Sequence, residues 1–485
     1  MGVKIAGDLF KQSDFIQCQK VILAVSGGGD SLALMFLVKD YFKTLSVPPE
    51  IIVVTVDHRL RRESAREAQI VAEICRAHHI KHIIVRWEGK KPKTHIASKA
   101  RIARYDLLFQ EAQKQGATLI MTGHTLNDQV ETYQMRCQRL QKKRYVGLQE
   151  IDGALYNKKA LETRVHSTEL DKTAYGFAQK NDEGICERGL SCIPREALLH
   201  KTVRLIRPLL GVERKTLRAY LRFNGKIWIE DPTNEDRRFE RVRVRQSLPP
   251  KKLMDIAKKV HQAALQRRQH AQKSADLIRA LDIRMEYGRC FIAKPADFLQ
   301  KNPNFSFVVG LFAVLMGGGF YLLSSQKLNK IVQRLSFLSP QKQRFTLAGS
   351  VVEYSQSGVA FWRESRNMKK AVVHPGKTCL WDGRYQITNH GFEALKVEAA
   401  PLEHLKFCLK NNGFTLKQPH FPSLQSLLML SNKKGCDIPE LTSQDFFCKN
   451  VTIKRIIAPF HWLSSREDAP LVHVVEPFFD IKVKR

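Results

Sequence analysis

The sequence predicts an α/β amino-terminal domain whose parallel sheet is flanked by helices. Two observations support this prediction. Short β-branched apolar runs alternate with longer helical segments over the first two hundred residues, and polar motifs follow several of the runs directly. Such alternation is typical of a parallel sheet with helices on both faces, where ligands bind beyond the carboxyl ends of the strands. A mainly helical middle domain and a small α+β carboxyl-terminal domain are predicted to follow.

The predicted strands and helices alternate in a regular order. The strands are short apolar runs at 21–25, 51–56, 83–85 and 119–122. Helical segments lie between them, notably 64–79 and 96–115. We therefore expect the ends of these strands to meet at one edge of the sheet.

The first strand leads directly into the hexapeptide SGGGDS. Glycines permit a tight turn there, and the apolar segment after it has the pattern of a helix. A strand, a glycine turn and a helix N-terminus together form an anion site. The expected phosphate contacts are Ser26, Gly27, Gly28, Gly29, Asp30 and Ser31, with Asp30 also able to hold Mg²⁺. No lysine follows the glycines, which excludes the Walker phosphate-binding motif. The simpler alternative is a glycine turn that joins the strand to the helix and binds no ligand.

Two further motifs follow later strands. VDHRLR places Asp57 and His58 after the second strand, near the expected nucleotide. GHTLNDQVET places His124 after the fourth strand, with Asp128 and Glu131 three residues apart. On a helix this spacing puts both carboxylates on one face, where they could hold an ammonium group or a metal. Acids are also common in a solvated first helical turn, which is the alternative interpretation.

The composition indicates a polyanionic partner. Lys and Arg number 80 against 47 Asp and Glu, a net charge of +33, and we expect a nucleic acid. The ten cysteines are scattered without a CxxC pair, which predicts neither a zinc ribbon nor disulfides and favours the cytoplasm. No signal peptide is expected. The uncharged segment 305–325 contains three central glycines, so we expect a buried core element and no membrane association.

The ordered motifs resemble the tRNA(Ile)-lysidine synthase family of the PP-loop ATP pyrophosphatase superfamily. The resemblance is strong over residues 20–148 and 203–250 and more general beyond them. It rests on SGGGDS, VDHRLR, KARIARY, GHTLNDQVET, IRPLL and EDPTNEDRRFERVRVR. It implies an adenine nucleotide alpha-hydrolase-like PP-loop fold.

The resemblance also implies a two-step reaction on the wobble cytidine of tRNA(Ile) with a CAU anticodon. ATP adenylates the C2 oxygen of the cytosine and releases pyrophosphate. The ε-amine of free L-lysine then attacks C2 and displaces AMP, which leaves lysidine and changes AUG reading to AUA reading. ATP and Mg²⁺ are thus the expected substrate and cofactor, and a homodimer is a possible assembly.

Residue roles follow from the resemblance at matching positions. Asp30 would hold Mg²⁺, and Arg104 would neutralise charge on the phosphates. Asp128 and Glu131 resemble the acids that handle lysine, and His124 is a further catalytic candidate. Arg207 resembles the arginine that positions the cytosine. The arginines expected to contact tRNA phosphates, because they alternate with valine and would form one face, are Arg237, Arg238, Arg241, Arg243 and Arg245.

The predicted domains are a catalytic domain at 1–220, a middle substrate and tRNA domain at 221–365, and a tRNA-binding domain at 371–485. Residues 151–202 form a longer and more polar connection than the family has, either a surface insert or an extra tRNA contact. In the last domain, strands are expected at 371–373, 452–457 and 472–475.

Two alternatives belong to other functional classes. A tRNA thiolase or another AMP-forming ligase could use the same loop, although many thiolases carry paired cysteines that this chain lacks. A non-catalytic tRNA-binding protein could retain the same fold. The presence of Asp30, Asp128 and Glu131 argues against a loss of catalytic activity. Lysine incorporation into RNA distinguishes all three.

Overall fold

The chain divides into two compact units. The computed structural model describes residues 7–61, 63–152, 187–231, 235–293, 302–336, 342–411, 420–441 and 450–479. Unit 1 comprises 1–178, 188–266 and 463–467, and unit 2 comprises 179–187, 267–462 and 468–485. The division falls within one helix, α10 (Leu253–Ala280).

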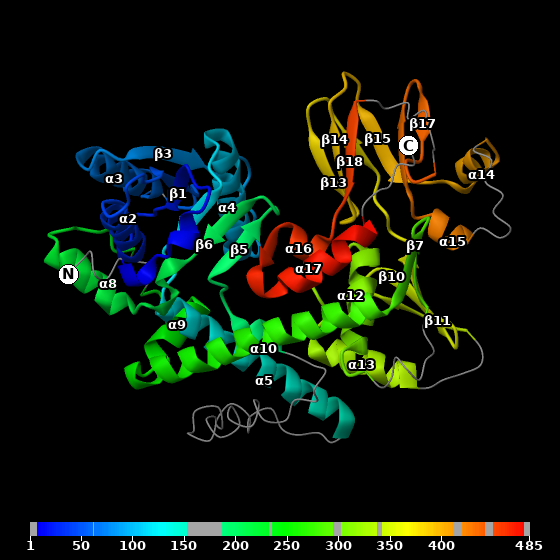
Figure 1. Ribbon diagram of the computed structural model, residues 1–485, viewed down its shortest axis with the longest axis horizontal. Coiled ribbons are helices and arrows are strands. Elements are labelled where there is room, and N and C mark those ends of the chain that lie inside the picture. The colour runs from blue at the N-terminus through cyan, green and yellow to red at the C-terminus, as the bar shows by residue number, and fades with distance from the viewer. Residues whose placement is uncertain are drawn as a thin grey trace. The chain divides into compact units, whose positions relative to one another are not determined.

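Unit 1 is built on a seven-stranded sheet in the order β19-β5-β6-β4-β1-β2-β3. Figure 1 labels β1, β3, β5 and β6 of this sheet. The strands from β6 to β3 are parallel, and β5 and β19 are antiparallel at one edge. Their bounds are β1 (Lys20–Ala24), β2 (Glu50–Asp57), β3 (Lys81–Arg86), β4 (Leu119–Thr122), β5 (Glu196–Leu199), β6 (Val203–Ile206) and β19 (Leu463–Ser465). The predicted parallel sheet is confirmed.

Apolar residues of the helices that follow β1 and β2 pack against this sheet. The helix after β1 is buried from Ser31 to Val38, where its sequence is apolar on all sides. The helix after β2 is amphipathic and buries only Ala68, Val71 and Cys75. The helices are α2 (Gly29–Phe42), α3 (Ser64–Ala77), α4 (Ile96–Gln115), α5 (Leu126–Asp152), α8 (Arg214–Phe223) and α9 (Glu240–Ser247), with short helices η1 (Gln12–Phe15), η2 (Arg188–Ser191), η3 (Pro208–Gly211) and η5 (Pro250–Lys252).

The strand order reverses at β1. The chain runs from β1 to β2 and β3 on one side, whereas β4 and β6 lie on the other. Ala24 at the end of β1 is paired with Val54 of β2 and Thr122 of β4, so the loops after these strands leave the sheet together. A reversal of this kind creates a ligand-binding crevice at the carboxyl ends of the strands.

Unit 2 contains three antiparallel sheets. Their orders are β7-β8-β11-β10-β9, β12-β15-β16-β17 and β13-β14-β18. The second and third share an apolar core that includes Trp381, Tyr385 and Val397. The strands are β7 (Asp282–Glu286), β8 (Arg289–Ala293), β9 (Gln343–Leu347), β10 (Ser350–Ser355), β11 (Gly358–Arg363), β12 (Ala371–Val373), β13 (Thr378–Trp381), β14 (Tyr385–Asn389), β15 (Leu395–Ala399), β16 (Leu428–Asn432), β17 (Gly435–Asp437) and β18 (Val451–Arg455).

In unit 2, every residue of α12 (Phe305–Gly317) is buried, and two helices of the unit, which begin at Ser325 and Ala458, pack against it. Gly318 ends it with φ +73°, and a Cβ there would lie 2.0 Å from the Asp382 carbonyl oxygen. The expectation of a buried core element is confirmed for 305–317, whereas Phe320 and Tyr321 later in the apolar segment are exposed. No described helix is long and apolar enough to cross a membrane. The other helices are α13 (Ser325–Ser336), α14 (Leu402–Asn411), α15 (Phe421–Leu424), α16 (Ala458–His461), α17 (Ala469–Val475), η6 (Arg466–Asp468) and η7 (Glu476–Phe479).

Two segments differ from the sequence prediction. Residues 472–475 are not a strand: they lie in α17, which has a proline in its first turn, where proline favours a helix start. Part of the predicted insert at 151–202 is β5 of the main sheet. Residues 153–186 of that segment lie outside the described residues. The three-part domain division stays a prediction.

Candidate active site

The nucleotide loop, residues 26–31, joins β1 to α2 as the motif predicts. Gly27 adopts φ +87°, which favours glycine. The Ser31 hydroxyl accepts a hydrogen bond from the Ser26 backbone N–H at 3.1 Å and donates to the Gly28 carbonyl at 2.9 Å. These bonds hold the loop against the first turn of α2, whose backbone N–H groups attract anions.

The loop after β4 lies against the start of α2. A Cβ on Gly123 would come within 2.8 Å of the Asp30 carbonyl oxygen and 3.0 Å of the Ser31 Cα. Only a residue without a side chain permits this approach. Gly123 therefore brings the GHTLNDQVET motif next to the nucleotide loop.

Asp30 is a half-buried residue, and one of its two carboxylate oxygens has no partner in the described chain. Its Oδ2 accepts a hydrogen bond from Arg214 Nε at 2.9 Å, whereas its buried Oδ1 has no hydrogen-bond partner in the described chain. Burial raises the pKa of Asp30, and the Arg214 guanidinium opposes that shift. An unpartnered buried carboxylate oxygen fits a Mg²⁺ ligand, since this ion uses one or two carboxylates plus phosphates and water. Within the described ranges, no group of three potential ligands forms an all-protein metal site.

Asp57 and His58 lie at the end of β2. Asp57 Oδ1 accepts hydrogen bonds from the Arg59 backbone N–H at 2.9 Å and the Ser64 hydroxyl at 2.7 Å. Burial raises the pKa of Asp57, but these bonds lower it overall, so the carboxylate orders the turn into α3. Burial and the nearby Arg104 lower the pKa of His58 to about 4, which keeps its imidazole neutral near pH 7.

Asp128 and Glu131 share one face of α5, and three arginines surround them. Arg241 lies 2.7 Å from Asp128 Oδ1 and 2.6 Å from Glu131 Oε2, and Arg245 lies 2.7 Å from Glu131 Oε1. Glu131 is 1% exposed. Its burial raises the pKa, but Arg245 and Arg241 lower it overall, so Glu131 stays ionised.

Arg214 is the functional candidate that sequence reasoning missed. It starts α8 and contacts Asp30 at 2.9 Å, Asp128 at 3.2 Å and Glu131 at 3.6 Å. It therefore links the nucleotide loop to the acid pair. The sequence around Arg214 did not single it out, because this arginine begins a helix, RKTLRAYLRF, that contains several other basic residues.

A second cluster gathers Arg104, Tyr105, His124 and Arg207. Arg207 is fully buried and donates to the Pro194 carbonyl at 2.7 Å and the Tyr105 hydroxyl at 3.3 Å, and its Nε has no partner in the described chain. Burial raises the pKa of the Tyr105 hydroxyl, but Arg207 and the nearby Arg104 lower it overall, to about 8. Burial and the same cations lower the pKa of His124, which is therefore neutral.

The arginines at 237–245 do not form one face. Residues 240–247 are helical, so a period of two spreads them around α9. Arg241 and Arg245, four residues apart, contact the acid pair, whereas Arg243 donates to the carbonyls of Arg237 and Arg238 at 2.7 and 2.9 Å. Arg238 also pairs with Asp236 at 2.7 Å. The expectation of a single arginine face is thus wrong.

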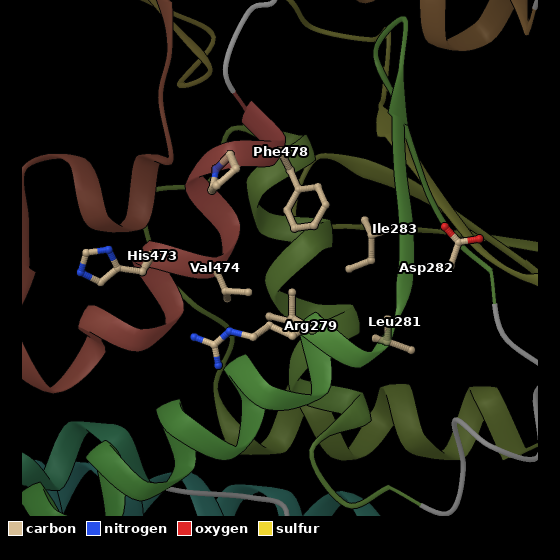
Figure 2. A pocket seen from close by; sticks show the side chains of 9 residues that line it. Arg279, Leu281, Asp282, Ile283, His473, Val474 and Phe478 are labelled. Atoms are coloured by element: carbon tan, nitrogen blue, oxygen red, sulfur yellow. The ribbon is translucent and has the colours of Figure 1, made fainter.

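A surface cavity of about 480 Å³ lies in unit 2, and none of the predicted site residues lines it. It is lined by residues of α10, β7, α17 and η7. Figure 2 shows Phe478 and Val474 on one side and Ile283 on the other. Its lining mixes apolar residues with Arg279, Asp282 and His473 and contains none of the nucleotide-loop residues, so the loop remains the candidate active site.

The fold and the nucleotide loop define a class of ATP-utilising enzymes, the PP-loop proteins. A family model described as "PP-loop domain" matches residues 4–171 and 175–252. The chain belongs to the tRNA(Ile)-lysidine synthase family. It is 68% identical to tRNA(Ile)-lysidine synthase from Bartonella tribocorum and 69% identical to that from Bartonella henselae, over 100% of each chain.

More distant relatives carry the same name. The chain is 32% identical to tRNA(Ile)-lysidine synthase from Brucella suis, over 97% of this chain and 96% of the relative. Among solved structures, U34-tRNA thiolase NcsA from Methanococcus maripaludis matches with a TM-score of 0.37 and 15% identity, over 54% of this chain and 77% of that chain.

Proposed function

We propose that the chain is an ATP-dependent ligase that joins lysine to C2 of the wobble cytidine of tRNA(Ile) with a CAU anticodon. The observation that carries the proposal is the junction of the nucleotide loop and the acid pair through Arg214. The nucleotide loop is suited to bind nucleotide phosphates, and the adjacent carboxylates of Asp128 and Glu131 are suited to bind an ammonium ion. Full-length identity to the Bartonella synthases supports the same substrate.

In the first step, the cytosine O2 attacks the α-phosphorus of ATP, and the bond to pyrophosphate breaks. The nucleotide loop binds the phosphates through backbone N–H groups and hydroxyls. Arg104 makes no hydrogen bond or ion pair with the described residues, so its charge is available to the phosphates. Asp30, through Oδ1, would hold a Mg²⁺ ion, which would supply further neutralising charge.

Arg207, Tyr105 and His124 are proposed to receive the base. The Nε–H of Arg207 has no partner in the described chain, so it is available to donate a hydrogen bond to a base oxygen. The Thr122 hydroxyl lies 2.8 Å from His124 Nδ1, which leaves Nε2 for substrate. Because His124 is neutral, it adds no charge repulsion to a cluster that already holds Arg104 and Arg207.

In the second step, the lysine ε-nitrogen attacks C2, and the C2–O2 bond breaks as AMP departs with the oxygen. Asp128 and the ionised Glu131 attract the ε-ammonium group, and a carboxylate accepts its proton before the free amine attacks C2. AMP release therefore depends on lysine, whereas pyrophosphate release does not.

Three finer features belong to the same proposal. Free L-lysine and Mg²⁺ are the expected co-substrate and cofactor. Eight cysteines of the described chain are free, which supports a cytoplasmic location. A homodimer is the proposed assembly, and light scattering of the purified protein tests it.

The test uses ATP, labelled lysine and an unmodified tRNA(Ile) with a CAU anticodon. We expect label in the RNA and one AMP released for each lysine incorporated. A tRNA with a different wobble base is the matched control and should acquire no label. RNA that stays unlabelled, with AMP release unchanged by lysine, would contradict the proposal. Sulfur transfer in its place would favour the thiolase alternative.

A further inference from the structure

Arg241 and Arg245 have two assignments that cannot hold at the same time. Their place in the basic segment predicts contacts with RNA phosphates. In the structure they bind Asp128 and Glu131, the acids proposed to attract lysine. The guanidinium groups and the lysine ε-ammonium group therefore compete for the same carboxylates.

The carboxylate oxygens are already occupied. Asp128 Oδ2 accepts hydrogen bonds from the Thr125 N–H at 2.7 Å and the Thr125 hydroxyl at 3.1 Å, and its Oδ1 contacts two arginines. Both Glu131 oxygens contact guanidinium nitrogens. Three guanidinium groups already face three acids, Asp128, Glu131 and Asp30, so a further ammonium ion there meets no excess of negative charge.

The three arginines differ in how readily they can leave. The Arg214 side chain is 18% exposed and is also bound to Asp30. The Arg241 side chain is 40% exposed and that of Arg245 is 28% exposed. Val242 and Val244 between them are buried, so α9 can stay anchored while the arginine side chains move.

RNA supplies the group that can exchange with the acids. Phosphate oxygens accept the same two-pronged hydrogen bonds from arginine as carboxylates do. Movement of Arg241 and Arg245 onto RNA phosphates would leave Asp128 and Glu131 with Arg214 alone. The acid pair would then be net negative and suited to an ammonium ion.

We propose that Arg241 and Arg245 take the place of the lysine ammonium group until RNA draws them away, so that tRNA binds before lysine. This inference rests on the proposed function and adds an order of binding to it. The exchange makes and breaks only ion pairs. Free lysine accordingly has low affinity for the protein without RNA.

Equilibrium dialysis of labelled lysine tests this order with the full-length protein. An ATP analogue that cannot be cleaved between the α and β phosphates is present throughout. We expect lysine affinity to rise about 5- to 150-fold when tRNA(Ile) with a CAU anticodon is added, the range typical of coupled sites. Equal lysine binding with and without the RNA, or no binding in either arm, would overturn the inference.

The double variant Arg241→Gln with Arg245→Gln isolates the two side chains. It should bind lysine without RNA more tightly than the unaltered protein does. The matched control is Arg243→Gln on the same helix, which should bind lysine as weakly as the unaltered protein does. A double variant that folds, as circular dichroism can show, but does not gain affinity also overturns the inference. Lysine incorporation by the unaltered protein, measured separately, distinguishes this failure from failure of the proposed function.

Discussion

At the scale of single residues, Asp30 connects the nucleotide loop to the rest of the site. One of its oxygens is bound by Arg214, and the other is buried without a partner in the described chain. The resemblance predicted its role from the motif alone. It could not reveal Arg214, because the contact joins residues 184 positions apart and no local pattern encodes it.

Replacing Asp30 tests its proposed contact with the phosphates. Asp30→Ala should reduce pyrophosphate release by ~100-fold or more, since charge stabilisation by one group at a reacting phosphate is of that order. Binding to tRNA should change little, because the phosphate contacts predicted for RNA lie elsewhere. Pyrophosphate release and filter binding measure the two effects. Equal loss of both would indicate misfolding instead.

Tyr105 gives a pH-dependent prediction. Its pKa is lowered to about 8 from an ordinary 10.0 because arginines surround it. The folded protein therefore loses this proton first, and the contribution of Tyr105 to stability rises between about pH 8 and pH 10 and is lost as pH falls through 8. Tyrosinate absorbance should show one group near pH 8 that Tyr105→Phe removes. An unchanged titration curve in that variant would refute the assignment.

At the scale of elements, the sequence predicted β1, β2, β3 and β4 of the main sheet, but not β5, β6 or β19. Runs such as Ile51–Val56 are β-branched and end at polar motifs, so local pattern was sufficient. Pattern failed at 472–475, where β-branched residues follow a proline-initiated helix start, and in the arginine segment, where alternation proved to be helical. In both places the contacts with the rest of the chain outweigh local propensity.

Gly123 tests the contact between the loop after β4 and α2. Gly123→Ala should destabilise the protein by ~1–3 kcal/mol and weaken ATP binding, because its Cβ would press on the backbone of Asp30 and Ser31. Gly211→Ala, where nothing lies within 4 Å, is the control. Chemical denaturation and nucleotide titration provide the measurements. Equal behaviour of the two variants would mean that this close approach is absent.

At the scale of the whole molecule, charge was the most informative property of the sequence. The excess of basic residues predicted a nucleic-acid partner. The net charge could not show which basic side chains are available to bind RNA phosphates. In the structure, several arginines form ion pairs with acids of the protein itself. The predicted tRNA-binding segment is therefore partly an internal ion-pair network.

The net charge of +33 also predicts strongly salt-dependent RNA binding. With 6–10 phosphate contacts, affinity should fall by roughly 10³–10⁵ between 50 and 200 mM salt. Filter binding across that range measures the slope. A slope close to zero would show that phosphate contacts contribute little to RNA affinity.

The central claim is that the site adenylates a cytosine and transfers lysine to it. Nucleoside mass spectrometry of tRNA(Ile) treated with the protein, ATP and lysine tests this most directly. We predict a wobble cytidine that has gained one lysine with loss of one water, and no change at any other position. An unmodified wobble cytidine, or a sulfur-containing nucleoside in its place, would contradict the account.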